Sequence, residues 1–384
     1  MNSWLGTEIK QLPGLIKSSW HSAFDQPDQN KSSNATLQFQ QQPFITYTKI
    51  IEGLTSPVAF VQSPFNGLYY VVDQIGYVYV YDGQTMEMMI DISKEIIKLN
   101  SMYDERGLLN LVFHPFEADL FYLYYTVPST AKDINCEARL EEWILAPDGR
   151  QAKKNRILFQ WEHQEANHFG SPIGFGSDGL LYMATGDGGG AGDRHGEIGN
   201  AQNLESQWGK ILTIDVNKNP VIIELYAIGF RNPWRCSFMS DGRLIVGDVG
   251  QDLYEGVHIV NRDENHEWRA VENGHIFDQA LFEQIREEIT PPLFWYNRSL
   301  GRSVIGGYET GGGYIFGDYT GGSSGDNVYL YRNGKILIQP KVEGRTKFLH
   351  SFGRDNEGNI YGLFEDKFGP SGKAGTIYRL SLNF

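Results

Sequence analysis

A short motif that recurs along the chain places the strongest limit on the fold. Each copy begins with a glycine or an acid, continues as a run of aromatic and aliphatic residues, and most copies end at an acid. The six copies are Gly67–Asp73, Asp119–Thr126, Gly179–Asp187, Gly242–Asp248, Gly313–Asp318 and Gly358–Glu365. Such runs are typical of β-strands, and their unbroken apolar character predicts strands that are buried on both faces.

The spacing of the copies favours a repeat architecture. Their ends run from 73 to 365, or 292 residues over five intervals, so one repeat is about 58 residues long. That length accommodates four strands and one long loop, which predicts an all-β, six-bladed β-propeller with long inter-strand loops. The strand Gly375–Leu382 is expected to close the ring by pairing with a strand near Tyr47–Ile51, because closure removes an exposed edge. A β-sandwich with strands that are alike by chance is the alternative.

The N-terminal region differs from the rest. Residues 25–43 are rich in Gln, Asn and Ser, which predicts a flexible linker. An N-terminal extension of residues 1–43 and a propeller of residues 44–384 are therefore expected. Helical spacing suggests a short amphipathic helix that docks or frays, with a membrane-surface anchor as the alternative. The apolar residues with this spacing are Leu5, Ile9, Leu12, Ile16 and Trp20.

The net charge of −14 makes nucleic acid an unlikely class of partner, since such a surface repels phosphate backbones. A neutral substrate such as a sugar is compatible with it. No apolar run is long enough for a spanning helix, and Met1–His21 lacks the pattern of a secretory signal, so the localisation stays open. The only cysteines, Cys136 and Cys236, allow either one bridge or two buried thiols.

Two loop sequences contain residues suited to catalysis or binding. His168 lies just before a predicted strand and can accept a proton near neutral pH, although a structural histidine is the alternative. Arg231 and Asn232 precede Pro233, which fixes an extended backbone and suits the guanidinium to binding carboxylates. The alternative for Arg231 is a structural ion pair. The acidic glycine turn from Gly247 to Asp252 is compatible with calcium or with an ordinary turn.

At these residues the sequence resembles the soluble pyrroloquinoline-quinone (PQQ) dependent glucose/sorbosone dehydrogenase family, which includes Hedgehog-interacting-protein-like propellers. The resemblance runs from about Gly53 to the C-terminus. The segments that carry it include Gly53–Pro57, Glu105–Leu109, Asn167–Gly170, Phe175–Gly179, Gly199–Asn203, Gly229–Pro233 and Asp248–Gln251.

The resemblance implies a role for each candidate residue. His168 matches the histidine that takes the proton of a sugar hydroxyl while hydride passes to the quinone. Arg231 and Asn232 match the pair that holds the quinone, and Arg345 and Lys347 are loose counterparts of a cationic pair. The resemblance implies calcium ligands at Gly250, Gln251 and Glu255.

The expected activity is a PQQ- and calcium-dependent oxidation of aldose sugars or related alcohols, with an unknown electron acceptor. Ser171 and Pro172 depart from the family pattern, which keeps a non-catalytic propeller that binds a protein or glycan as the second hypothesis. A calcium-dependent lactonase is the third hypothesis. The resemblance also allows a Cys136–Cys236 bridge.

Overall fold

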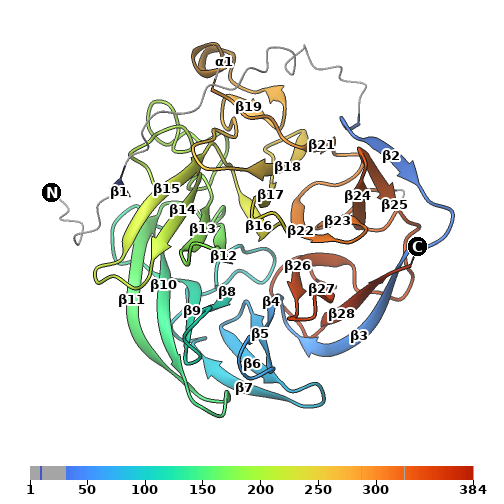
Figure 1. Ribbon diagram of the computed structural model, residues 1–384. Helices are drawn as coiled ribbons and strands as arrows, with labels where there is room; N and C mark the ends of the chain where they lie inside the picture. The colour runs from blue at the N-terminus through green and yellow to red at the C-terminus, as the bar shows by residue number, and fades with distance from the viewer. Residues whose placement is uncertain (1–8, 11–31, 287, 324, 384) are drawn as a thin grey trace. The chain divides into compact units, whose positions relative to one another are not determined.

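A computed structural model describes residues 9–10, 32–286, 288–323 and 325–383 (Figure 1). The described residues form 28 strands and one helix, so the all-β prediction is confirmed. The chain divides into two compact units, unit 1 with Met1–Ala35 and His168–Gly306, and unit 2 with Thr36–Asn167 and Gly307–Phe384. Within the described residues, no helix is long and apolar enough to cross a membrane.

Unit 1 contains two antiparallel meanders of four strands. The first consists of β12 (Ser171–Phe175), β13 (Leu181–Thr185), β14 (Lys210–Asp215) and β15 (Ile222–Ile228). The second consists of β16 (Pro233–Phe238), β17 (Leu244–Asp248), β18 (Tyr254–Val260) and β21 (Phe294–Asn297). A small hairpin, β19 (Val271–Glu272) and β20 (His275–Ile276), precedes helix α1 (Gln279–Ile285). Asp278 caps this helix by accepting a hydrogen bond from the N–H of Leu281.

Unit 2 contains four further groups of four strands. The first two are β4 (Pro57–Gln62), β5 (Tyr69–Asp73), β6 (Tyr77–Tyr81) and β7 (Met86–Asp91), then β8 (Leu108–Phe113), β9 (Leu120–Pro128), β10 (Cys136–Leu145) and β11 (Ala152–His163). The third is β22 (Val304–Thr310), which begins in unit 1 and continues into unit 2, with β23 (Gly313–Asp318), β24 (Val328–Arg332) and β25 (Lys335–Ile338). The fourth is β26 (Phe348–Arg354), β27 (Ile360–Glu365), β28 (Gly375–Leu382) and β3 (Ile45–Leu54).

Each of the six predicted strands is present, and each is the second strand of its group: β5, β9, β13, β17, β23 and β27. Burial explains their composition, because β9 and β13 are buried along nearly their whole length on both faces. The last strand β11 instead alternates exposed charged residues with buried ones, as expected for a strand near an edge. The number of blades and their closure into a ring stay predictions.

The predicted pairing of the C-terminal strand is confirmed. Strand β28 pairs antiparallel with β3, with Ile377 opposite Ile51 and Leu380 opposite Tyr47. The early strand β3 and the C-terminal strand β28 therefore lie side by side in one sheet, and this removes an open edge from β28.

The prediction of a flexible linker is wrong for residues 36–39. Strand β2 (Thr36–Phe39) pairs in parallel with β25, with Leu37 opposite Ile336. Backbone pairing supplies the order that the polar composition did not predict. Ile9–Lys10 likewise form a two-residue strand, β1, parallel to β15, and not a helix turn. The rest of the predicted helix and of residues 25–31 lies outside the described residues.

The meanders explain how unit 1 positions its loops. In an antiparallel pair, the start of one strand and the end of the next lie at the same end of the sheet. The residues before β12 therefore meet those after β13, and the residues before β16 meet those after β17. His168 and Asp187 flank the first pair, and Arg231 and Val249 flank the second.

Candidate functional site

His168 and Asp187 form a buried hydrogen-bonded dyad. Nδ1 of His168 lies 2.7 Å from Oδ1 of Asp187, and the two residues are 3% and 1% exposed. Gly186 permits this approach, since a Cβ at that position would lie 2.2 Å from the carbonyl oxygen of His168. The strand ends therefore bring together two residues that are 19 positions apart in the chain.

Two further groups fix the carboxylate of Asp187. Trp268 donates its indole N–H to Oδ2 over 2.9 Å, and the N–H of Gly189 donates to Oδ1 over 3.0 Å. Burial opposes ionisation, but the adjacent His168 outweighs it and holds the pKa of Asp187 below its usual value. An ionised Asp187 selects the tautomer of His168 with a proton on Nδ1, so Nε2 is the nitrogen that can act as a base.

Arg231 and Asn232 lie where β16 begins, and Asp248 holds their backbone. The N–H groups of Arg231 and Asn232 donate to the two oxygens of Asp248 over 3.0 and 2.7 Å. Because the carbonyl of Arg231 also accepts the N–H of Asp187 over 2.8 Å, the two loop pairs are hydrogen-bonded to each other.

The guanidinium of Arg231 is oriented by three neighbours. Nη1 donates to the carbonyl of Val249 over 3.0 Å, and Nε donates to the side chain of Gln251 over 3.2 Å. The guanidinium also lies 5.8 Å from the ring centre of Trp268. These contacts leave Nη2 of Arg231 for another anion or acceptor. The structure thus brings His168, Arg231, Asn232 and Gln251 into one network around Trp268.

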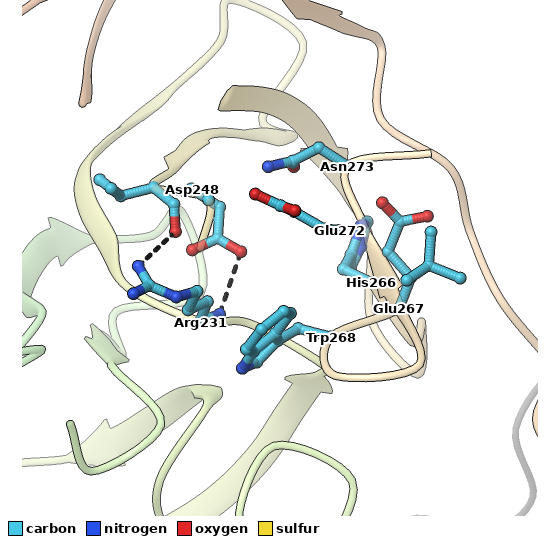
Figure 2. Close-up of a pocket in the computed structure, with 10 residues that line it drawn as sticks. Arg231, Asp248, His266, Glu267, Trp268, Glu272 and Asn273 are labelled. Atoms are coloured by element: carbon cyan, nitrogen blue, oxygen red, sulfur yellow. Dashed lines mark hydrogen bonds between the residues drawn. The ribbon is translucent and has the colours of Figure 1, made fainter. Parts of the chain in front are cut away.

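A small cavity lies beside this network (Figure 2). The empty space between the residues that line it, including the part open to solvent, is about 180 Å³. Burial raises the pKa of Asp248 to about 7 and that of Glu267 well above its usual value. The residues that line the cavity are Arg231, Asp248, Val249, Gly250, His266, Glu267, Trp268, Val271, Glu272 and Asn273.

The residues predicted to bind calcium have protein partners. Oε2 of Glu255 accepts the N–H groups of Gly250 and Val304 over 3.3 and 2.9 Å, and Oε1 contacts the guanidinium of Arg298. Gln251 accepts hydrogen bonds from Arg231 and Gly192 through its side chain. The Glu255 carboxylate therefore does not fit a calcium ligand.

Gly250 requires the absence of a side chain, because a Cβ there would lie 1.6 Å from the carbonyl oxygen of Tyr254. The main-chain roles predicted for Gly250 and Gln251 stay predictions. Among the residues that the structure describes, no group of three or more His, Cys, Asp or Glu residues could hold a metal ion.

The remaining predicted residues, Arg345 and Lys347, belong to unit 2. The guanidinium of Arg345 contacts Asp326 and Asn327, donates to the carbonyl of Thr346 over 2.8 Å, and is only 6% exposed. Lys347 is exposed, and its backbone N–H donates to Asp366 over 3.1 Å. The two side chains thus lie in different environments, and their role in binding a cofactor stays a prediction.

Three residues of unit 1 that contact the candidate site or the Glu255 carboxylate were not predicted from the sequence. Asp187 stood in a noted acidic glycine turn, but its pairing with His168 follows only from the β12–β13 register. Trp268 lies in the loop before β19 and Arg298 in the short turn after β21, and neither belongs to a motif that would have indicated it. Cys136 and Cys236 are both free thiols, which does not support the bridge.

Comparison with known proteins agrees with this architecture. Residues 55–321 match the family model for glucose/sorbosone dehydrogenase. The HIPL2 protein of Arabidopsis thaliana is 33% identical over 216 residues, which cover 48% of this chain and 30% of that protein. Mouse Hedgehog-interacting protein is 23% identical over 378 residues, which cover 86% of this chain and 52% of that protein. The chain thus spans about half the length, or less, of these relatives.

Solved structures with the same fold include two sugar dehydrogenases. The PQQ-bound aldose sugar dehydrogenase from Streptomyces coelicolor has a TM-score of 0.67 and 18% identity, over 88% of this chain and 100% of that one. The apo-form of the soluble aldose sugar dehydrogenase from Escherichia coli has a TM-score of 0.65 and 15% identity, with the same coverage. Since the family model matches well over half of its residues, the chain belongs to the glucose/sorbosone dehydrogenase family.

Proposed function

We propose that this protein is a six-bladed propeller oxidoreductase that oxidises aldose sugars or related alcohols, with PQQ as the electron acceptor. The His168–Asp187 dyad is the observation that carries the proposal. Its histidine is buried, its tautomer is set by a carboxylate, and Trp268 fixes that carboxylate in turn. A histidine held in this way is suited to abstracting a proton. A histidine that only packed in the core would not need a carboxylate to set its tautomer.

The reaction divides into a proton transfer and a hydride transfer. Nε2 of His168 takes the proton from the sugar hydroxyl as the carbon–hydrogen bond gives up its hydride and the carbonyl forms. The ionised Asp187 stabilises the imidazolium that results, and Trp268 prevents the carboxylate from turning away. The quinone, when bound, supplies the two-electron acceptor for the hydride.

Arg231 is the side chain that best fits the cofactor. Its backbone and two of its guanidinium nitrogens are already held, so Nη2 is preorganised for a carboxylate without further ordering. Asn232 shares this rigid segment through Asp248. Calcium is not part of the proposal at Glu255, because Gly250, Val304 and Arg298 already contact both of its oxygens.

A non-catalytic propeller that binds a protein or glycan is the second candidate. It is favoured by Arg345, whose guanidinium contacts Asp326 and packs 4.2 Å from the ring centre of Phe364. An arginine committed to such contacts contributes to stability and is poorly placed to hold a carboxylate of a ligand. Hydrolysis of a lactone without any electron acceptor would instead identify the third candidate, a lactonase.

Replacement of Arg231 by alanine is expected to weaken quinone binding by about 10- to 100-fold, because one charge-assisted hydrogen bond contributes roughly 1.5–3 kcal/mol. Calorimetric titration with PQQ measures the dissociation constant. Arg243→Ala is a matched control, since Arg243 pairs with the exposed Asp241 at the opposite end of β16 and β17. It should bind PQQ as the unaltered protein does.

The same preparations, supplied with PQQ, aldoses and an artificial electron acceptor, test turnover. Reduction of the acceptor only when sugar and PQQ are both present supports the proposal. Absence of heat exchange with PQQ, together with absence of turnover, rejects it and favours the non-catalytic candidate.

A further inference from the structure

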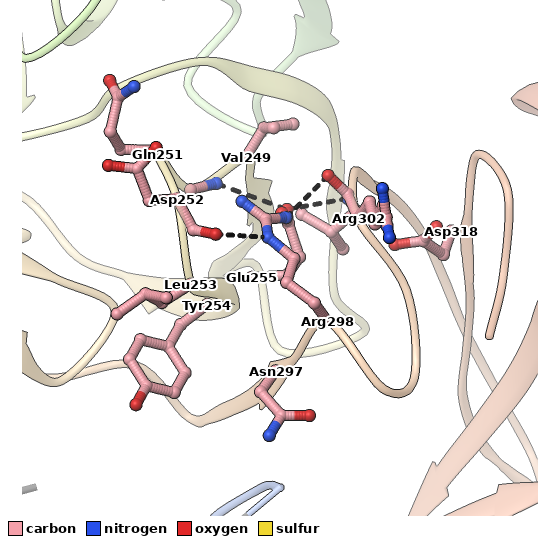
Figure 3. A network of polar contacts seen from close by, with 12 residues as sticks. Val249, Gln251, Asp252, Leu253, Tyr254, Glu255, Asn297, Arg298, Arg302 and Asp318 are labelled. Atoms are coloured by element: carbon pink, nitrogen blue, oxygen red, sulfur yellow. Dashed lines mark hydrogen bonds and ion pairs between the residues drawn. The ribbon is translucent and has the colours of Figure 1, made fainter. Parts of the chain in front are cut away.

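We infer that Arg298 acts as an internal cation that replaces a bound calcium ion at the Glu255 turn. The turn and its surroundings present oxygen atoms to the guanidinium from three residues (Figure 3). Arg298 contacts Oε1 of Glu255, donates through Nε to the carbonyl of Asp252 over 2.8 Å, and donates through Nη1 to the carbonyl of Arg302 over 2.7 Å. One carboxylate and two main-chain carbonyls are the ligand types that calcium selects in proteins.

Burial makes a cation necessary at this position. Glu255 is 0% exposed, and an ionised carboxylate without a partner is costly in such an environment. The N–H groups of Gly250 and Val304 serve one of its oxygens, while Arg298 serves the other. Because the guanidinium carries a full positive charge, it meets the electrostatic requirement that a metal ion would otherwise meet.

The strand register brings the arginine to the turn. Strand β21 pairs antiparallel with β18, which places Tyr296 opposite Glu255 and Asn297 opposite Tyr254. Arg298 directly follows β21, so it emerges beside the first residues of β18, where Glu255 lies. The side chain of Arg298 is 25% exposed. Its aliphatic part can therefore lie along the turn while its guanidinium reaches the buried carboxylate of Glu255.

A calcium ion could bind Glu255 only by displacing this guanidinium, because two positive charges repel each other at contact distance. The geometry therefore points to calcium-independent packing of the Glu255 carboxylate. This inference concerns the stability of the turn, and it holds whether or not the protein oxidises sugars.

The first test uses the unaltered protein. Its melting temperature in 10 mM calcium is expected to lie within about 1 °C of the value in excess EDTA, since a ligand stabilises only where it binds the folded state. Differential scanning calorimetry or fluorimetry measures this without quinone or sugar. A calcium-dependent rise of several degrees overturns the inference.

The second test removes the internal cation. Arg298→Ala is expected to lower the melting temperature in EDTA by roughly 5–10 °C, because it leaves Glu255 buried without a counter-charge. Calcium at 10 mM should then restore roughly 3–8 °C, since the vacated oxygens form a weak cation site. Arg286→Ala is the matched control, because Arg286 pairs with Glu283 on the surface and should change little in either condition.

If calcium does not raise the melting temperature of Arg298→Ala, the inference is contradicted. Where Arg298→Ala does not fold, Arg298→Lys replaces it. The lysine ammonium keeps the positive charge but lacks the planar donor geometry of the guanidinium. The melting temperature of Arg298→Lys should therefore fall moderately and still not respond to calcium. A calcium response of Arg298→Lys that exceeds that of the unaltered protein by several degrees counts against the inference.

Discussion

Replacement of His168 by alanine is expected to lower sugar turnover by about 10²- to 10⁴-fold, the usual contribution of a positioned general base. The affinity for PQQ should stay within a few-fold of the unaltered value, because the quinone contacts are assigned to Arg231 and Asn232. The measurement is steady-state reduction of an artificial acceptor at saturating quinone, combined with calorimetric titration of PQQ. A selective loss in kcat with retained cofactor binding would support a role in the proton transfer.

His195 provides the matched control for this prediction. It lies in the same unit as His168, and its ring hydrogen-bonds the carbonyl oxygen of Gly189 over 3.0 Å; no carboxylate of the described residues forms an ion pair with it. His195→Ala should therefore turn over sugar within a few-fold of the unaltered protein. Equal turnover of His168→Ala and the unaltered protein would contradict the assigned base.

Asp187→Asn tests the same dyad from its other member. Asp187 is a positioning residue. Replacing both Asp187 and His168 should lower turnover little more than replacing His168 alone, since the pair acts as a unit.

Because the pKa of Asp187 is lowered in the folded state, its contribution to folding is present above about pH 4 and is lost as the pH falls through the folded value. Asp187→Asn should thus be less stable at pH 7, and the difference should shrink in acid.

Much of the fold could be predicted because burial acts on each inner strand separately. Strands β13 and β17 are buried over their whole length, and all their residues except the last, Thr185 and Asp248, are apolar or glycine. That leaves a continuous signal in the sequence. The pairing of β28 with β3 followed from the need to cover an edge. The order of residues 36–39 could not be predicted, because β2 has little apolar character and gains its order from the partner strand β25.

The candidate site could be predicted only where it lies beside those strands. His168 and Arg231 precede β12 and β16, and the antiparallel register then determines which residues meet them. Trp268 and Arg298 come from loops and reach the site by long-range contacts that no short motif encodes. The calcium role predicted for Glu255 came from the family resemblance. The local sequence gave no sign that the guanidinium of Arg298 contacts this carboxylate.

Lys210→Met is expected to cause the largest loss of stability among these variants, about 3–5 kcal/mol in the free energy of unfolding. Lys210 is fully buried at the start of β14. Its ammonium donates to the carbonyls of Asn200, Ala201 and Trp208 over 2.7, 3.0 and 2.6 Å. Methionine has a similar length and no donor, so it would leave these buried carbonyls without their shared partner.

The reason for so large an effect is that Lys210 holds the loop between β13 and β14, which also holds the dyad. Asn200 donates from its side chain to the carbonyl of Asp187 over 2.8 Å, so a change at Lys210 reaches His168 through two intervening residues, Asn200 and Asp187. Denaturant titration measures the free energy, and Lys218→Met is the control, because Lys218 is 57% exposed on the turn after β14. A loss below about 1 kcal/mol for Lys210→Met would mean that water satisfies the three carbonyls and that the ammonium is dispensable.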